Sequence, residues 1–249
     1  MNKLIPALAL GLLIVGGQST VSAKPAAKHT RKPAAAAAAK AWDQAVTLTA
    51  EGTPLLGNPA APVKLIEYIS FTCPHCADFN VEAHDGLRSG MVRKGQVSVE
   101  LRPFLRNEID LLPSLLALCG TKEQYFGNSD ALLAAQKTWF KEPADKSYQA
   151  RWKALEGDKV AQRKVVAKDL GLVTVMQARG FSVPAIDACL TDQVQAARLG
   201  ALTNKAASDG GVIGTPSFVI NGKLQDIYGW PELAPRLKAA VAAANTAVR

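Results

Sequence analysis

Two cysteines three residues apart, at the start of an expected helix, constrain this chain more than any other feature. The run Cys73-Pro74-His75-Cys76 directly follows a strand-like segment, 63–70. Proline suits the first helical position, because its missing N–H is not needed there. Cys73 is then the capping residue, with its sulfur near free backbone N–H groups and the positive end of the helix dipole. Both cysteines share one helix face, close enough to form a disulfide or to bind one metal ion.

A thiolate stabilised at such a helix start attacks readily and is a good leaving group. The pattern therefore predicts a thiol–disulfide exchange centre. Each unit by which the pKa of Cys73 is lowered is worth ~1.36 kcal/mol in favour of the reduced form. His75 can contribute by donating to the thiolate or by adding positive charge. The alternative is that His75 is an exposed spacer.

Residues 1–23 have the pattern of a secretory signal peptide, with a positive start, an apolar run and a small-residue cleavage site that ends at Ala23. A membrane anchor is the alternative, but the apolar run has roughly a dozen residues, fewer than the ~20 that span a bilayer. We therefore expect export to the periplasm, with cleavage after about Ala23.

The formal net charge of +8 is concentrated near the start of the chain. Residues 24–42 form a low-complexity, alanine-rich basic linker. Lys3 and the five basic residues of 24–40 account for six of the positive charges and leave +2 for residues 41–249. The basic character thus belongs mainly to a tail, which argues against a nucleic-acid partner.

Four cysteines follow the expected signal peptide. An even count in an exported protein favours disulfides over free thiols or zinc. Cys73 and Cys76 form one pair, and Cys119 and Cys189 form the other by elimination. The second pair is either another redox centre or a structural bridge, and the bridge is favoured because neither cysteine starts a helix or has a neighbouring cysteine. No metal and no cofactor is expected.

The rest of the chain predicts a mixed α/β fold interrupted by helices. Asn221-Gly222 is a strong hairpin signal between a strand at 212–220 and a return strand, and a last helix begins at Pro231. We expect residues 43–108 and 209–249 to form one domain and residues 109–208 an inserted helical domain. The other expected strands are 46–49, 63–70 and 96–104, and the expected helices of the block are 109–118, 130–140, 147–155, 159–170, 183–190 and 192–208.

Over roughly residues 60–245 the chain resembles the DsbA-like family of exported thiol:disulfide oxidoreductases, which have a thioredoxin fold with an inserted helical domain. The resemblance is carried by Glu67, by the Cys73–Cys76 motif six residues later, and by Gly214-Thr215-Pro216 before the hairpin. A CxxC motif alone is a moderate signal, because zinc sites use it too. The same motif after a strand, with a distant Thr-Pro, is a strong one.

The resemblance implies a role for each of these residues. Cys73 becomes the exposed nucleophile and Cys76 the more buried resolving thiol. Pro216 carries a cis peptide bond, and its loop lies against the disulfide. Glu67 becomes a buried acid beneath the disulfide, whereas the strand pattern alone leaves it as an exposed residue.

Two features differ from the best-known oxidase of the family. Thr215 stands where that oxidase has an aliphatic residue, and threonine is also found there among isomerases. The Cys119–Cys189 pair is absent from that oxidase and resembles a second, structural bridge of some relatives.

The expected function is the introduction of disulfide bonds into reduced or unfolded exported proteins. The expected partners are those substrates and a DsbB-like, quinone-linked oxidase in the membrane, and the protein is expected to be a monomer. An isomerase or reductase that is kept reduced in the periplasm is the alternative within this class. From another class, the chain could bind copper or zinc through Cys73, Cys76 and His75 or His84.

Overall fold

The computed structural model describes residues 41–140 and 146–247. The predicted signal peptide and almost all of the predicted linker lie outside these described residues. Trp42, which the sequence analysis placed at the end of the linker, instead begins a turn of 3-10 helix, η1 (Trp42–Gln44), and its backbone N–H donates to the carbonyl of Arg93. The folded part therefore begins slightly earlier than predicted.

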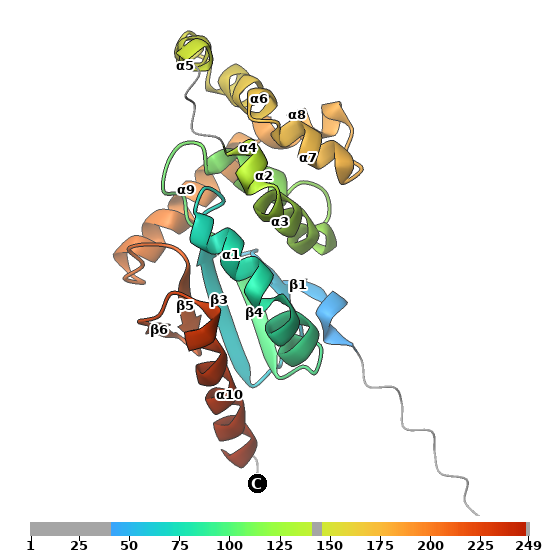
Figure 1. The fold of residues 1–249 in the computed structure, drawn as a ribbon, viewed down its shortest axis with the longest axis vertical. Coiled ribbons are helices and arrows are strands. Elements are labelled where there is room, and N and C mark those ends of the chain that lie inside the picture. Colours follow the sequence, from blue (N-terminus) through green and yellow to red (C-terminus); the bar gives the residue numbers. More distant parts are fainter. Residues whose placement is uncertain (1–40, 141–145, 248–249) are drawn as a thin grey trace, which may run out of the picture. The chain divides into compact units, whose positions relative to one another are not determined.

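A single six-stranded sheet runs through the structure in the order β1-β2-β4-β3-β5-β6 (Figure 1). The two central strands, β3 and β4, are parallel, and every other pair is antiparallel. The strands are β1 (Val46–Leu48), β2 (Pro54–Leu56), β3 (Val63–Ile69), β4 (Val97–Pro103), β5 (Ser217–Ile220) and β6 (Lys223–Gln225).

Strand β2 was not predicted, since Gly52, Pro54 and Gly57 favoured turns. It is only three residues long, so it shows no usable periodicity, and it begins with a proline, which a strand tolerates at its first position. Its pairing with β1 and β4 comes from tertiary context.

Alternation along β3 decides which residues face the main core. Leu65 and Ile69 belong to the cluster that contains Phe79 of α1 (Pro74–Ala83) and Leu233 of α10 (Trp230–Ala247). Glu67 lies between them on the same face and is only 5% exposed. The buried position implied by the family resemblance is the one observed, and the exposed alternative is wrong.

The opposite face of β3 is covered by another part of the chain. Tyr68 packs there against Ala206 of α9 and against Val212. Helices therefore lie on both faces of the central strands, as expected where parallel strands are present.

Helix α1 (Pro74–Ala83) continues into η2 (His84–Val92), a stretch of π-helix that leads towards β4. Eight α-helices then stand between β4 and β5 in the described part of the chain, so the expected helical insertion is present (Figure 1). They are α2 (Leu111–Ala117), α3 (Tyr125–Ala134), α4 (Gln136–Trp139), α5 (Lys146–Lys153), α6 (Lys159–Asp169), α7 (Leu172–Ala178), α8 (Val183–Thr191) and α9 (Gln193–Ser208), with η3 (Lys122–Gln124) before α3.

Three of these helices differ from the prediction. The single helix expected over 130–140 is two, because α3 ends at Ala134 and α4 begins at Gln136. Helix α3 begins at Tyr125 and not at residue 130, although Asn128 and Ser129 are weak helix formers. Both side chains are buried and hydrogen-bonded to backbone carbonyls, which offsets that weakness. Helix α7 was not predicted at all, and it begins after Gly171, whose φ of 78° ends the preceding helix.

The hairpin after β5 forms at Asn221-Gly222 as predicted. Both residues have positive φ, 48° and 82°, as the common two-residue turn requires. The Asn221 side chain also accepts a 2.8 Å hydrogen bond from the backbone N–H of Lys64, which fixes the hairpin to β3. The chain then enters α10 (Trp230–Ala247).

Residues 40–249 group into one compact unit. The division into a domain of 43–108 and 209–249 and a helical domain of 109–208 therefore stays a prediction. Among the described residues, none of the helices has both the length and the apolar character needed to cross a membrane.

Candidate active site

Three segments that are distant in sequence meet at one edge of the sheet. Because β3 and β4 are parallel, their carboxyl ends share this edge, and β5, antiparallel to β3, begins there. Cys73 follows β3 and caps α1, with Pro74 at the first helical position, as predicted. Thr215 and Pro216 precede β5, and the peptide bond between them is cis.

The two thiols of the motif are unbonded in this structure, which thus describes the reduced form. The sulfur of Cys73 lies 3.3 Å from the carbonyl oxygen of Thr215, to which it donates a hydrogen bond when the thiol is protonated. The Thr215 hydroxyl is buried, makes no hydrogen bond to the protonated thiol, and is placed to donate to the Cys73 sulfur once this becomes a thiolate.

Cys73 is less accessible than the family resemblance implied. The whole residue is 2% exposed, against 0% for Cys76. The expectation of an exposed nucleophile is therefore wrong for this conformation. The physical reason is the loop at Thr215, which lies directly against the sulfur.

The two thiols have strongly different proton affinities. The pKa of Cys73 is lowered to about 5, chiefly by a hydrogen bond from the Cys76 thiol. Burial acts in the opposite direction and raises this pKa. Hydrogen bonds from the Thr215 side chain and from the backbone N–H groups of Cys76 and His75 lower it further. Burial raises the pKa of Cys76, and its hydrogen bond to Cys73 and the Cys73 charge raise it further. At neutral pH the site thus holds a thiolate beside a protonated thiol, a pair suited to thiol–disulfide exchange.

The source of this polarisation differs in part from the sequence prediction. We attributed the Cys73 thiolate to amide groups at the helix start, and these do contribute. The largest contribution comes from the Cys76 thiol. The His75 side chain is exposed, and what this residue contributes to the Cys73 pKa is its backbone N–H.

Glu67 lies on β3, on the core face shared with α1. Burial raises its pKa to about 7; Arg88 opposes this shift and Asp130 adds to it. A negative charge on Glu67 in turn raises the pKa of Cys76. The acid and the resolving thiol are therefore electrostatically coupled, so protonation of one favours loss of the proton from the other.

Sequence reasoning missed Gln136, a buried residue of α4. Its side-chain amide donates to the carbonyl oxygens of Phe71, at 2.7 Å, and Cys73, at 2.9 Å. A residue of the inserted helices thus holds the loop that carries the redox motif. A single glutamine at a helix start carries no sequence signal for this role, because such residues usually face solvent.

Asp110 is a second buried residue that the sequence did not single out. Its carboxylate is fully buried and accepts hydrogen bonds at 2.9 Å from the Ser70 hydroxyl and from the backbone N–H groups of Thr72 and Arg106. Asn107 adds a 2.9 Å hydrogen bond from its amide to the Thr72 hydroxyl. This network fixes the residues that lead into Cys73.

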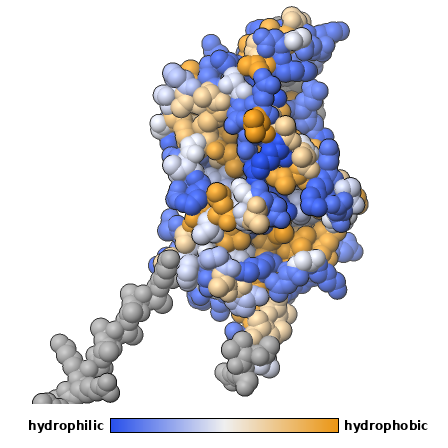
Figure 2. All heavy atoms as spheres, turned by 180° about the vertical axis from the view of Figure 1, so that it is seen from behind, coloured by the Kyte–Doolittle hydropathy of each residue, from blue (hydrophilic) through white to orange (hydrophobic). Residues whose placement is uncertain are grey.

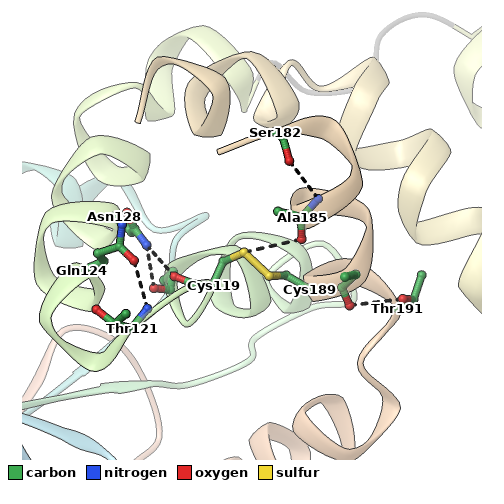
Figure 3. The surroundings of a disulfide bond; sticks show 10 residues. Cys119, Thr121, Gln124, Asn128, Ser182, Ala185, Cys189 and Thr191 are labelled. Atoms are coloured by element: carbon green, nitrogen blue, oxygen red, sulfur yellow. Dashed lines mark hydrogen bonds between the residues drawn. A yellow bond between two sulfur atoms is a disulfide. The ribbon is translucent and has the colours of Figure 1, made fainter. Parts of the chain in front are cut away.

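Cys119 and Cys189 form a disulfide, with 5.6 Å between their Cα atoms (Figure 3). Cys119 follows α2 and Cys189 lies on α8, so the bridge joins two inserted helices. Asn128 of α3 donates to the carbonyls of Ala117 and Cys119 and fixes the α2 end of the bridge.

The residues considered as metal ligands do not form a metal-binding group in the described part of the chain. Within residues 41–140 and 146–247, no three side chains of the His, Cys, Asp and Glu types lie together as a metal-binding group. His84 is half-exposed at the start of η2 and contacts Asp85.

Comparison with known proteins places the chain in a family. The thioredoxin family model matches residues 49–238. A protein-disulfide isomerase from Novosphingobium aromaticivorans is 34% identical, with a TM-score of 0.70, over 75% of this chain and 96% of that one. The alpha-DsbA1 protein of Wolbachia pipientis is 20% identical, with a TM-score of 0.62, over 81% of this chain and 97% of that one, and shares the fold.

A Rickettsia typhi protein, provisionally named a protein-disulfide oxidoreductase, is 27% identical over 175 residues, or 70% of this chain. The chain matches only 56% of that protein's length. The residues that the family model matches, 49–238, contain the two-cysteine motif, the cis proline loop and the inserted helices, so the fold is the thioredoxin fold with a helical insertion. By this family match and by the similarity to the Novosphingobium protein, the chain belongs to the thioredoxin family.

Proposed function

We propose that this protein is a thiol:disulfide oxidoreductase that introduces disulfide bonds into exported proteins through Cys73 and Cys76. The observation that carries the proposal is the difference in proton affinity between the two thiols, with the pKa of Cys73 at about 5 and that of Cys76 raised. A stabilised Cys73 thiolate favours the reduced form, and a protein that is stable when reduced is a good oxidant.

The proposed reaction transfers two electrons from a substrate dithiol to the protein. A substrate thiolate attacks the Cys73 sulfur of the oxidised protein, the Cys73–Cys76 bond breaks, and Cys76 leaves as a thiolate that is then protonated. The second substrate thiolate attacks the substrate sulfur of the mixed disulfide and releases Cys73 as a thiolate. We assign to Glu67 the exchange of the Cys76 proton; the electrostatic coupling of the two groups supports this role.

The remaining site residues hold and present the sulfur. Pro74 starts α1, and the backbone N–H of His75 helps to stabilise the thiolate. The loop at Thr215 and Pro216 pairs with the main chain of the substrate, a loose mode of recognition that suits many sequences. Cys119–Cys189 is structural.

We place this activity in the periplasm, on the basis of the predicted signal peptide at residues 1–23. The substrates are reduced or unfolded exported proteins, and a DsbB-like membrane oxidase restores the disulfide. The surface carries hydrophobic patches between hydrophilic residues (Figure 2), and among the exposed large apolar side chains is Ile213, 94% exposed and two residues before Thr215. Such residues suit contact with unfolded chains.

An isomerase or reductase that is kept reduced is the second candidate. Two observations favour it: the Novosphingobium protein is named a protein-disulfide isomerase, and Thr215 precedes the cis proline. Trapping the thiols of Cys73 and Cys76 in living cells separates the two functions. A mostly oxidised pair supports the oxidase, and a mostly reduced pair overturns it in favour of the isomerase.

Exchange activity itself is tested with purified protein and a reduced model substrate. We expect the oxidised protein to form the substrate's disulfide, and the Cys73→Ser variant to lose this activity while it stays folded. Metal analysis of the same sample tests the copper or zinc alternative. A stoichiometric metal together with no thiol exchange would overturn the proposal.

A further inference from the structure

A cavity of about 580 Å³ lies at the same sheet edge as the redox motif. It is open to solvent and is lined by the segment after β4, by α6 and by α9. The backbone N–H of Phe104, in that segment, donates a 2.6 Å hydrogen bond to the carbonyl of Ile69, which ends β3. The cavity therefore lies on the β4 side of Cys73, whereas Thr215 and Pro216 lie on its β5 side.

One wall of the cavity is shared with the active-site network. Asn107 lines the cavity and also donates to the hydroxyl of Thr72, the residue before Cys73. Leu105, on the same wall, donates its backbone N–H to the hydroxyl of Thr203 on α9 at 3.1 Å. A chain bound to Cys73 thus reaches this cavity within a few residues, because an extended chain advances ~3.3 Å per residue.

The charge of the cavity favours an anion. Arg106, Lys159 and Arg163 line it, against one acid, Glu108. None of the three cations forms an ion pair with any residue in the described ranges. One terminal nitrogen of Arg163, Nη1, is buried without a hydrogen-bond partner. A carboxylate in the cavity would pair with the accessible part of the Arg163 guanidinium through charge-assisted hydrogen bonds.

The cavity also has room for an apolar part of a bound side chain, next to the three cations. Leu105 and Leu111 contribute to its wall, and Gly200 of α9 leaves space, because a Cβ at that position would meet no atom within 4 Å. A neighbouring cavity of about 300 Å³ also includes Arg163 and is lined by Trp152. A substrate segment that carries a glutamate or aspartate beside apolar residues would offer both a carboxylate for the cations and apolar groups for this wall.

We propose that this cavity, the Arg163 pocket, binds an acidic side chain of the substrate polypeptide while its cysteine exchanges with Cys73. The inference rests on the proposed function and adds a sequence preference to it. The protein's own basic segment is a poor occupant of the pocket, since residues 24–40 carry five basic and no acidic residues.

The test compares reduced two-cysteine peptides that differ only by Glu or Gln, placed roughly two to six positions from a cysteine. The rate constant for their oxidation by the oxidised protein is measured at low ionic strength. We expect the best-placed Glu peptide to react about 3- to 10-fold faster than its Gln partner, and salt to reduce this ratio.

Two variants remove the pocket without touching the redox motif. Arg163→Gln removes the cation, and Gly200→Leu fills the space. Ala201→Leu, on the adjacent exposed position of α9, is the matched control. We expect the Glu-to-Gln ratio to fall to about one in both pocket variants and to persist in the control.

Oxidation of the Gln peptide reports whether each variant is folded and active. If Gly200→Leu does not oxidise the Gln peptide, the result for Arg163→Gln alone decides whether the pocket exists. A ratio of one in the wild type, or an unchanged ratio in Arg163→Gln, overturns the pocket. Failure of the proposed function looks different, because neither peptide is then oxidised. In that case nuclear magnetic resonance titration with cysteine-free peptides decides. Chemical shift changes at Gly200 with the Glu peptide but not with the Gln peptide support the pocket, and the absence of such changes overturns it.

Discussion

The side-chain amide of Gln136 donates a 2.9 Å hydrogen bond to the carbonyl oxygen of Cys73. The donor belongs to the inserted helices and the acceptor to the residue that caps α1. The same amide also satisfies the carbonyl of Phe71. One buried side chain thus holds both ends of the short segment that presents the nucleophile, which ties the redox motif to the helical insertion.

We expect Gln136→Met to destabilise the reduced protein by about 1–3 kcal/mol, because it leaves a buried backbone carbonyl without its donor. The pKa of Cys73 should also rise, because the loop that aims its sulfur at the helix amides is no longer held. Urea unfolding measures the first effect, and thiolate absorbance against pH measures the second. Thr138→Met, on an exposed position of the same helix, is the control and should change neither quantity. An unchanged pKa in Gln136→Met would limit this residue to a structural role.

The second prediction separates the thiol hydrogen bond from the helix start. Cys76→Ala removes the largest cause of the low Cys73 pKa, so that pKa should rise from about 5 by roughly one to two units. Cys76→Ser keeps a hydrogen-bond donor and should leave the value lower than in Cys76→Ala. The pH dependence of alkylation of Cys73 measures both. Equal pKa values in the two variants would indicate that the backbone amides at the helix start, and not the hydrogen bond from residue 76, cause the low pKa of Cys73.

A thiolate with this pKa has a direct redox consequence. The pKa is lowered from 9.0 to about 5, so at pH 7 the reduced form gains about two pKa units of stabilisation. That is ~3 kcal/mol, or ~60 mV of oxidising power for a two-electron couple. The gain is lost as the pH falls towards 5, where the thiolate becomes protonated, so the advantage of the reduced over the oxidised form in unfolding experiments should shrink towards acid pH.

The third prediction concerns Glu67 and the pH dependence of stability. The folded-state pKa of about 7 exceeds the ordinary value of 4.5, so the folded protein holds this proton more tightly than the unfolded chain. Stability from this group is complete below pH 4.5 and is lost as the pH rises through about 7. Glu67→Gln should therefore be more stable than the wild type by about 1–3 kcal/mol near pH 8, with little difference near pH 4.

Urea unfolding of both proteins across this pH range is the measurement. Glu82→Gln, at an exposed position on α1, controls for the loss of one negative charge. If Glu67→Gln tracks the wild type at all pH values, Glu67 is not the buried ionisable group described above. If Glu67 also exchanges the proton of Cys76, formation of the mixed disulfide, the step in which Cys76 leaves, should slow in the same variant, although its stability rises.

The parts of the fold that the sequence predicted are those specified by local chemistry. Pro74 fixes the start of α1, and Asn221-Gly222 supplies the two positive φ angles of the hairpin. The strand before the motif is long enough to show its pattern. Thr215-Pro216 was assigned to the active site through the family resemblance and not through its own local pattern.

The parts that were missed depend on contacts between segments distant in sequence. Gln136 lies 63 residues from Cys73, and no local pattern marks it as a residue that holds the motif. Burial of Cys73 depends on a loop 142 residues away. Strand β2 is too short to show periodicity, and the buried Asn128 of α3 is a poor helix former that tertiary hydrogen bonds retain.

The fourth prediction concerns the disulfide between Cys119 and Cys189, which closes a loop of 70 positions. In the chain-entropy model such a bridge stabilises the folded protein by ~4 kcal/mol, mainly by restricting the unfolded chain. The Cys119→Ala, Cys189→Ala double variant should therefore unfold at lower urea concentration, with a loss of about 2–4 kcal/mol. The pKa of Cys73 should stay at about 5, because neither cysteine is among its causes.

Urea unfolding and alkylation of Cys73, measured on the same double variant, test both parts of this expectation. A large fall in exchange rate at conditions where the variant is still folded would indicate that the pair takes part in the redox chemistry. Retained exchange with reduced stability would support a bridge that holds α2 to α8 and, through Asn128, keeps α3 in place. Gln136 lies shortly after α3 in the chain, so the bridge would then also help to hold the Gln136 side chain against the carbonyl of Cys73. At urea concentrations below the unfolding midpoint, the pKa of Cys73 should therefore rise in the double variant at a lower urea concentration than in the wild type.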